Sequence, residues 1–289
     1  MSMTMLSETA VVHMQYDLDN VPSLPDPDWT RFVCISDTHC QRFPIPDGDV
    51  LLHGGDLTHT GTLKQFETTV DWLKGLPHPV KIVVGGNHDL TLDNNNNWYD
   101  TNFQHWHLQG KEDVQAIREL LLGNEAKERN LIYLQDELFE FRTKDSGRLW
   151  SVYGSPWSPY FGGWAFNYPR AQAQRYASAI PKADILLTHG PPFGIFDRVN
   201  TGELVGCEAL LSRVAQLRPR LHLFGHIHED HGAVVCKWSS NDQVHGSETV
   251  FVNGANWPAG NKAYLPSGER TQFGMGPCSP VIVDLKDSI

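Results

Sequence analysis

Five short segments combine histidine, aspartate and asparagine with small residues in patterns suited to binding metal ions. The segments are SDTHC, GGDLT, GGNHD, LTHGPP and FGHIH, and the seven groups that could bind metal are Asp37, His39, Asp56, Asn87, His189, His226 and His228. Carboxylates, imidazoles and an amide oxygen together suit hard or borderline divalent metals. Seven such groups are too many for one tetrahedral ion. They fit two ions roughly 3.5–4 Å apart, bridged by a carboxylate and a hydroxide, the arrangement used for in-line attack on phosphorus.

The charge of this cluster differs from that of the whole chain. Two divalent ions with Asp37, Asp56 and a bridging hydroxide carry about +1, which attracts an anion. The whole chain has 23 Lys and Arg against 34 Asp and Glu, a formal charge of −11. Such a chain is poorly suited to broad electrostatic binding of nucleic acid or an anionic membrane. We therefore expect a small phosphoester substrate, no stable nucleic-acid polymer and no membrane partner.

Each of the five segments closes a short apolar run that is typical of a buried strand. These runs are Arg31 to Asp37, Val50 to Asp56, Lys81 to Asn87, Asp184 to His189 and Leu221 to His226. Residues with helical spacing occur at 62–76, where Thr62 and Gln65 form a capping box, and at 114–121 and 210–217. Strands alternating with helices indicate an α/β fold. In open α/β sheets, ligands bind beyond the carboxyl ends of the strands, which is where the polar groups fall.

A second group of strand-like segments has few helices between its members. It comprises residues 131–134, 138–141, 150–153, 233–238, 249–252 and 280–285. These segments indicate an additional sheet, and two stacked sheets flanked by helices would fit. Residues 1–29 are polar and rich in proline, and we interpret them as an extended tail or a strand crossing the domain surface. We expect one compact domain over 30–289, with long loops at 92–109 and 257–280.

The five cysteines are odd in number and widely spaced, and none forms a C-x-x-C pair. This usage favours a reducing intracellular compartment. The sequence begins without a basic segment followed by an apolar stretch, and its apolar runs are too short to span a bilayer. We expect a cytoplasmic protein, and its oligomeric state stays open.

The order D-x-H, G-D, G-N-H-D, T-H-G and G-H-x-H resembles the calcineurin-like metallophosphoesterase superfamily from about Phe32 to Leu285. The segments VCISDTH, YGSPWSPYFGGWAFNYPR, THGPPFG, VGCEALL and FGHIHE are similar to its brain-type branch of metallophosphoesterase-domain-containing phosphodiesterases. The resemblance implies a four-layer αββα sandwich. It also implies a hydrolase that cleaves phosphodiester bonds of small nucleotides, such as cyclic nucleotides, by attack of a metal-bridging hydroxide.

The resemblance also implies a role for each residue. Asp37, His39 and His228 would hold the first metal, and Asp56 would bridge. Asn87, His189 and His226 would hold the second. His88 would face the substrate, stabilising charge on the phosphate or protonating the leaving oxygen, and Asp89 would orient the His88 ring or else cap the following turn. Manganese, iron and zinc all remain possible as the two ions, including a mixed-valence pair.

Several alternatives stay open. Arg42 and Arg198 could steady phosphate oxygens together with Asn87 and His88, although a solvated or salt-bridged arginine is the commoner outcome. Trp157, Tyr160 and Phe193 could stack a nucleobase, but packing or loop anchoring is the better interpretation of each. The same metal set could serve a phosphomonoesterase or a protein phosphatase. A scaffold that binds metal without turnover is the alternative from another class.

Overall fold

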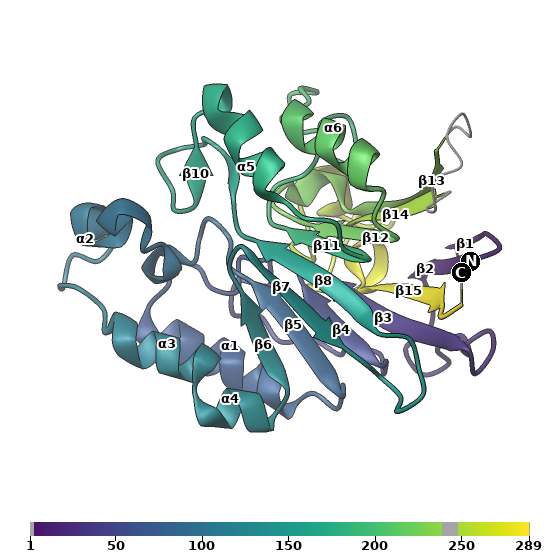
Figure 1. Ribbon diagram of the computed structural model, residues 1–289. Coiled ribbons are helices and arrows are strands. Elements are labelled where there is room, and N and C mark those ends of the chain that lie inside the picture. Colours follow the sequence, from purple (N-terminus) through teal and green to yellow (C-terminus); the bar gives the residue numbers. More distant parts are fainter. Residues whose placement is uncertain (1–2, 239–247, 289) are drawn as a thin grey trace.

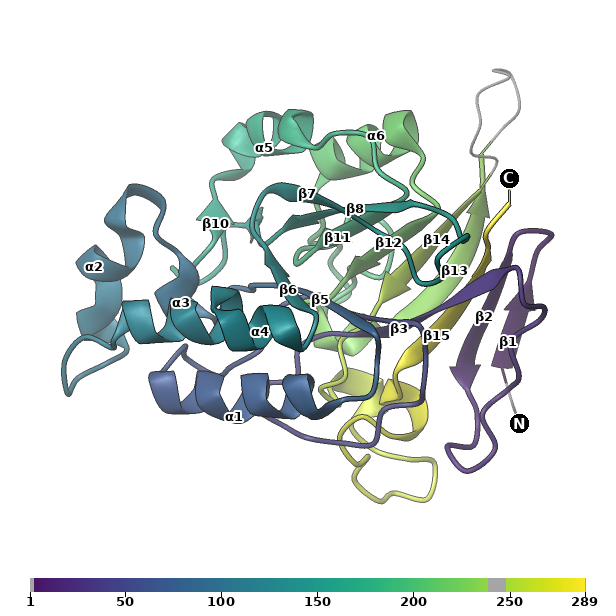
Figure 2. The ribbon, with the colours of Figure 1, turned by 60° about the horizontal axis from the view of Figure 1, so that its bottom comes forward.

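Two β-sheets lie face to face, and helices cover the outer face of each sheet (Figures 1 and 2). The computed structural model describes residues 3–238 and 248–288. The first sheet has the strand order β1-β2-β15-β3-β4-β5-β6 and the second has the order β13-β14-β12-β11-β8-β7. The layers confirm the predicted αββα sandwich.

The strands have the following bounds. The first sheet contains β1 (Met3–Leu6), β2 (Ala10–Gln15), β3 (Trp29–Ile35), β4 (Val50–His53), β5 (Val80–Val84), β6 (Leu131–Leu134) and β15 (Val281–Lys286). The second contains β7 (Glu137–Phe141), β8 (Trp150–Ser155), β11 (Ile185–Thr188), β12 (Leu221–Phe224), β13 (Gly232–Lys237) and β14 (Glu248–Asn253). A short parallel pair is formed by β9 (Ser158–Pro159) and β10 (Asn167–Tyr168).

The helices are divided between the two outer faces. The first sheet is covered by α1 (Leu63–Gly75), α3 (Val114–Leu122) and α4 (Asn124–Glu128), and the second by α5 (Ala173–Ala179) and α6 (Glu208–Leu217) (Figure 2). A short α2 (Trp98–Asn102) lies in the 92–109 loop. Single 3₁₀ turns are η1 (Leu90–Leu92), η2 (Asn95–Asn97), η3 (Phe103–His105), η4 (Arg170–Gln172), η5 (His228–Asp230), η6 (Gly260–Lys262) and η7 (Gly276–Cys278).

Alternation along β3 shows how the apolar runs build the layers. Phe32 and Cys34 are buried between the two sheets, whereas Val33 and Ile35 pack under the helices of the first sheet. Successive side chains of a strand point to opposite faces, so a strand buried on both faces is apolar throughout. The apolar run of β3 therefore ends where the strand leaves the core, and the polar residues begin at that point.

The N-terminal segment differs from the prediction. The prediction was an extended tail or a strand crossing the surface; β1 and β2 are indeed strands, but they extend the first sheet, and β2 pairs with β15 in antiparallel register. Val12 is fully buried in the core between the sheets. The partner of β2 lies at the far end of the chain, so no local sequence pattern could indicate this pairing.

The division of strands between the sheets also differs. The second group of predicted strands does not form one sheet, because β6 and β15 join the first sheet. Conversely β11 and β12, which were predicted with the first group, belong to the second sheet. The helix α1 begins after Thr62, whose hydroxyl accepts the Gln65 amide at 3.3 Å, as the capping box predicted.

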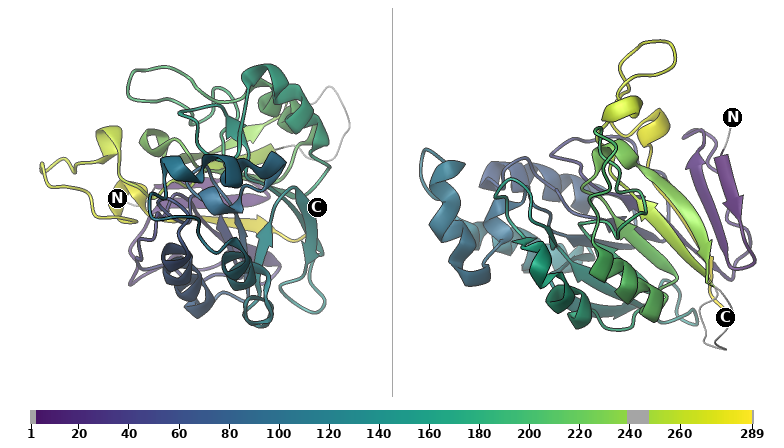
Figure 3. Two further views of the ribbon diagram at one scale, coloured as in Figure 1. Left: turned by 90° about the vertical axis from the view of Figure 1, so that its left-hand side faces the viewer. Right: turned by 90° about the horizontal axis from the view of Figure 1, so that it is seen from above.

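The two long loops are partly ordered into turns. Residues 92–109 contain η2, α2 and η3, and residues 257–280 contain η6 and η7. The second of these loops stands out from the body of the molecule (yellow in Figure 3). In the described part of the chain, every helix falls short of the length and apolar character needed to cross a membrane.

Candidate metal centre

The first sheet contributes ligands from the loops that follow three neighbouring parallel strands. Asp37 and His39 follow β3, Asp56 follows β4, and Asn87 follows β5. Asp37, His39 and Asp56 have φ values of 54°, 43° and 54°. Non-glycine residues seldom adopt this left-handed conformation, and it bends the chain sharply as each strand ends. The bends place the side chains at the common carboxyl edge of the sheet.

The second sheet contributes the remaining ligands in the same way. His189 directly follows β11, and His226 and His228 follow β12. His226 also has a left-handed backbone, with φ of 69°. Stacking of the sheets brings these three imidazoles against the loops of the first sheet.

One half of the cluster consists of Asp37, His39, Asp56 and His228. One possible ligand atom from each of these four lies within 4.8 Å of the others. His228 Nε2 lies 3.1 Å from Asp37 Oδ1 and 3.4 Å from His39 Nε2, and His39 Nε2 lies 3.7 Å from Asp56 Oδ2. These are the four residues that the resemblance assigned to the first metal and the bridge.

The other half is centred on Asn87. The Oδ1 atom of Asn87 lies 2.8 Å from His189 Nε2 and 2.7 Å from His226 Nδ1. His189 Nε2 is also 3.5 Å from Asp56 Oδ1, so the two oxygens of Asp56 face different halves. The structure therefore brings all seven predicted ligands together, with Asp56 between the two groups.

Backbone carbonyls fix the tautomers of two ligand rings. His39 Nδ1 donates to the Thr58 carbonyl at 3.0 Å, and His189 Nδ1 donates to the Gly54 carbonyl at 2.9 Å. In each ring Nε2 then keeps its lone pair and faces the cluster. This second hydrogen bond is the usual support of a metal-binding histidine.

Two glycines allow the backbone to approach the carboxylates. A Cβ atom at Gly225 would lie 2.0 Å from Asp37 Oδ2, and one at Gly86 would lie 2.3 Å from Asp56 Oδ1. No side chain can be accommodated at these separations. The G-H-x-H and G-G-N-H-D motifs thus need glycine immediately before their ligand residues.

The protonation states of the cluster suit cations. Burial by itself raises the pKa of Asp37, but the hydrogen bond and charge of His228 outweigh it and hold this pKa well below its usual range. Burial raises the pKa of Asp56 to about 8. Burial lowers the pKa of His39 well below its usual value and that of His226 to about 3, so both imidazoles are neutral. For His228, burial lowers the pKa, but the hydrogen bond to Asp37 outweighs it and the net pKa is raised.

The donor set therefore fits divalent metal ions. Neutral imidazoles, an amide oxygen and buried carboxylates face one another at short range. Cations would replace the proton that the raised pKa favours on Asp56, and would compensate the burial of two acids.

His88 and Asp89 do not form the predicted pair. His88 Nδ1 donates to the His59 carbonyl at 2.8 Å, so a backbone group rather than Asp89 orients the ring. The buried Asp89 carboxylate accepts the amides of Leu57, Thr58 and Gly86 at 2.9–3.1 Å and the Thr58 hydroxyl at 2.7 Å. It does not cap the following turn through its side chain either. Asp89 instead joins the Asp56 loop to the Asn87 loop.

The two candidate arginines are exposed and donate to backbone carbonyls. Arg42 is exposed and donates to the Thr68 carbonyl of α1 at 2.8 Å. Arg198 is exposed and donates to the Gly202 carbonyl of its own loop at 2.7 Å. Their predicted contact with phosphate finds no support in these interactions.

The aromatic residues beside the cluster are not the ones that the sequence singled out. Trp164 lies against His88, with ring centroids 3.9 Å apart, and Trp257 lies 5.2 Å from His39. Phe161 is 64% exposed and its ring lies 6.4 Å from His226. By contrast, Trp157 donates its indole N–H to Asp136, which confirms the anchoring interpretation. The sequence offered one signal for these two tryptophans. Trp164 ends the glycine-rich segment FGGW, and Trp257 stands at the start of the 257–280 loop.

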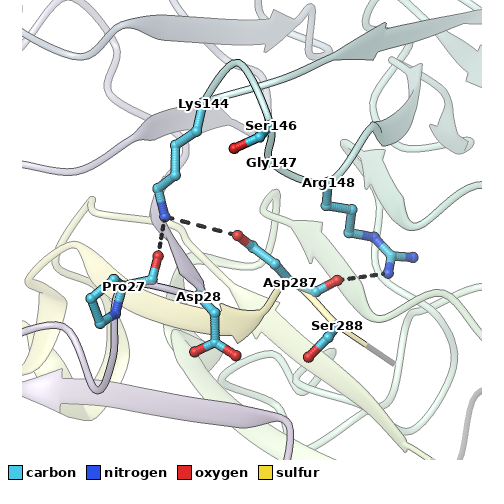
Figure 4. A pocket seen from close by; sticks show the side chains of 8 residues that line it. All are labelled: Pro27, Asp28, Lys144, Ser146, Gly147, Arg148, Asp287 and Ser288. Carbon is cyan, nitrogen blue, oxygen red and sulfur yellow. Dashed lines mark hydrogen bonds and ion pairs between the residues drawn. The ribbon is translucent and has the colours of Figure 1, made fainter.

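A separate surface pocket near the C-terminus contains none of the predicted site residues. Its volume is about 540 Å³, and Figure 4 shows its lining. Lys144 donates to the Pro27 and Trp29 carbonyls at 2.7 and 2.8 Å, and Arg148 donates to the Asp287 carbonyl at 3.1 Å. These cations bind backbone carbonyls of the protein, and their hydrogen bonds join the β7–β8 hairpin to residues 27–29 and to Asp287.

Comparison with known proteins agrees with the motifs. The family model described as calcineurin-like phosphoesterase matches residues 30–230. Human and mouse proteins named metallophosphoesterase domain-containing protein 1 are each 41% identical over 219 residues, 72% of this chain and 63% of theirs. The chain thus spans less than two thirds of the length of these relatives. The Caenorhabditis elegans protein UPF0046 protein K07C11.7 is 34% identical over 249 residues, 84% of this chain and 75% of its own.

The matched region carries all seven ligands of the cluster, from Asp37 to His228. The resemblance of the motifs to the superfamily and to its metallophosphoesterase-domain branch is confirmed. The chain belongs to the calcineurin-like phosphoesterase family.

Proposed function

We propose that this chain is a phosphoesterase that depends on two divalent metal ions and cleaves phosphodiester bonds, with small nucleotides such as cyclic nucleotides as substrates. The observation that carries the proposal is the convergence of seven ligating groups with His88 beside them. Asp37, His39 and His228 would hold one ion. Asn87, His189 and His226 would hold the other, and Asp56 would serve both. Such ions activate water and neutralise charge on phosphoryl oxygens.

His88 is the proton donor in this proposal. Its Nδ1 is engaged by the His59 carbonyl, which leaves Nε2 for the substrate. As the oxygen of water bonds to phosphorus, the bond to the leaving oxygen breaks and its electron pair stays on that oxygen. His88 Nε2 gives this oxygen a proton, and the proton released by the attacking water restores His88. General acid catalysis of this kind typically contributes about 10²–10⁴-fold.

The surroundings of the cluster favour a diester over a monoester. A phosphomonoester carries a charge of about −1.5 to −2 at neutral pH, whereas a diester carries one charge. Trp257 lies beside His39 and Phe161 lies beside His226, and both candidate arginines donate to backbone carbonyls. An aromatic rim suits the second organic group of a diester better than a second negative charge.

The same features support a small substrate and a cytoplasmic location. A chain of formal charge −11 repels long nucleic acid. All five cysteines are free thiols, which agrees with a reducing compartment.

The test is hydrolysis of aryl phosphodiesters by manganese-loaded protein. We expect the diester to be cleaved faster than the matching monoester, and His88→Ala to lower kcat for a phenyl diester by about 10²–10⁴-fold. His105→Ala, which removes an exposed histidine of η3, should keep full activity. Metal analysis of native protein and a screen of cyclic nucleotides, mononucleotides and diester lipids would then identify the metal and substrate.

Other outcomes contradict the proposal in different ways. Faster cleavage of the monoester would identify a phosphomonoesterase or protein phosphatase. Binding of two ions without hydrolysis in any divalent metal would identify a scaffold. Full activity of His88→Ala would remove His88 from the mechanism.

A further inference from the structure

The His88 ring belongs to a stack of three aromatic rings that reaches the 92–109 loop. The Trp164 indole lies 3.9 Å from the His88 ring at an interplanar angle of 30°. Trp106 lies 3.8 Å from Trp164 at 38°. Two rings cannot occupy one indole face at these separations, so Trp164 is held between His88 and Trp106. All three rings come from different loops.

Other contacts limit the remaining movements of His88. Its Nδ1–H donates to the His59 carbonyl, and its backbone N–H donates to Asp56 Oδ1 at 2.8 Å. The edge of the ring meets His39, with centroids 4.7 Å apart and planes at 86°. The Trp164 indole covers one face of the ring. Without that indole, the imidazole could rotate toward the space that the indole fills.

The 92–109 loop is anchored to the same turn that orients His88. His107 Nε2 donates to the Thr60 carbonyl at 2.8 Å, and its Nδ1 accepts the Tyr99 hydroxyl at 2.6 Å. Thr60 follows His59, whose carbonyl accepts the hydrogen bond from His88 Nδ1. The loop therefore holds His88 twice, through Trp106 on its ring face and through His107 on its hydrogen-bonding turn.

We propose that Trp164 is a positioning residue for His88, and that Trp106 extends this role to the 92–109 loop. The inference rests on the proposed function of His88 as the group that acts on the leaving oxygen. A proton donor must lie within hydrogen-bonding reach of that oxygen, and a displacement of about 1 Å can cost about 10²-fold in rate. Trp164 keeps Nε2 directed at the reacting bond by filling the space beside the imidazole.

The test is a double-substitution cycle measured on diesters with phenol, nitrophenol and dinitrophenol leaving groups. Trp164→Ala should lower kcat by about 10–100-fold for the phenyl diester, with little change in KM. The loss of kcat in Trp164→Ala should vary with the leaving group in the same way as the loss of kcat in His88→Ala. In the His88→Ala background, Trp164→Ala should cost little more, because the positioned group is absent. Trp164→Phe should restore most of the rate, and Trp106→Ala should give a smaller loss of the same kind.

Trp157→Ala is the matched control. Trp157 lies in the same segment and is also half-buried, but its ring packs on Phe166 and Tyr176. We expect this variant to lose stability without changing the leaving-group dependence. Long-range ¹H–¹⁵N spectra of zinc-loaded protein give a second measurement: His88 should show one set of ring nitrogen signals with a hydrogen-bonded Nδ1–H in the unsubstituted protein, and a changed or averaged pattern in Trp164→Ala.

The outcomes separate the two proposals. If the unsubstituted protein cleaves no diester, the proposed function fails and this inference fails with it. Three results would overturn only the positioning role, provided that His88→Ala impairs cleavage. In the first, Trp164→Ala lowers kcat by the same factor with and without His88. In the others, Trp164→Ala raises only KM, or behaves as Trp157→Ala does. An unchanged His88 spectrum in Trp164→Ala would also overturn it.

Discussion

At the scale of single residues, the carboxylate of Asp89 connects the two loops that carry Asp56 and Asn87. It accepts four hydrogen bonds, three of them from backbone amides. Burial raises the pKa of Asp89 to about 6, and the hydrogen bonds oppose this rise. The residue therefore supports the ligands without being one.

Asp89→Asn should weaken both folding and metal binding. Asparagine keeps one acceptor oxygen but turns an NH₂ group toward amides that need an acceptor, at a cost of about 1–3 kcal/mol for each unsatisfied group. We expect a lower free energy of unfolding in urea and about 10–100-fold weaker manganese binding by calorimetry. Asp93→Asn is the control, since Asp93 is buried and accepts the Phe166 and Asn95 amides away from the ligands. It should lose stability but keep manganese affinity; equal manganese binding by both variants would contradict the role of Asp89.

Among the helices and strands, those with a local sequence signal were predictable, whereas pairings between distant segments were not. Runs that end in polar residues identified β3, β4, β5, β11 and β12, and each ligand lies just beyond its strand. Left-handed bends at Asp37 and Asp56 were not predictable, because aspartate adopts this conformation only when its surroundings hold it there. The assignment of strands to sheets failed because pairing joins segments far apart in the chain.

The second strand, β2, is the clearest example of such a distant pairing. Val12→Ala should lower the free energy of unfolding by about 2 kcal/mol, because two methyl groups leave a fully buried site between the sheets. Leu6→Ala in β1 is the control: Leu6 is 74% exposed, and we expect a change within about 0.5 kcal/mol. Urea denaturation measures both variants. A Val12→Ala protein as stable as the unsubstituted one would mean that residues 1–15 behave in solution as the tail that the sequence indicated.

Across the molecule, stability should depend on buried histidines that are not metal ligands as well as on the ligands. His222 is fully buried in the core between the second sheet and α6, beside Phe224 and Phe251. The Thr188 hydroxyl donates to the Gly190 carbonyl, so it accepts from His222 Nε2 at 2.9 Å. His222 Nδ1 has no hydrogen-bond partner among the described residues. The core thus holds a neutral imidazole that water cannot reach.

This imidazole should make the protein sensitive to acid. Burial lowers the pKa of His222 to about 3, whereas an unfolded histidine titrates near pH 6.5. Between these values the unfolded chain binds the extra proton, so stability falls as the pH falls below 6.5. At about 1.4 kcal/mol per pKa unit, one such histidine costs about 2 kcal/mol between pH 7 and pH 5. His222→Leu should remove that part of the slope in urea denaturation of metal-free protein, whereas His105→Leu, on an exposed turn, should keep it. Parallel slopes for His222→Leu and the unsubstituted protein would show that His222 becomes protonated in the folded core.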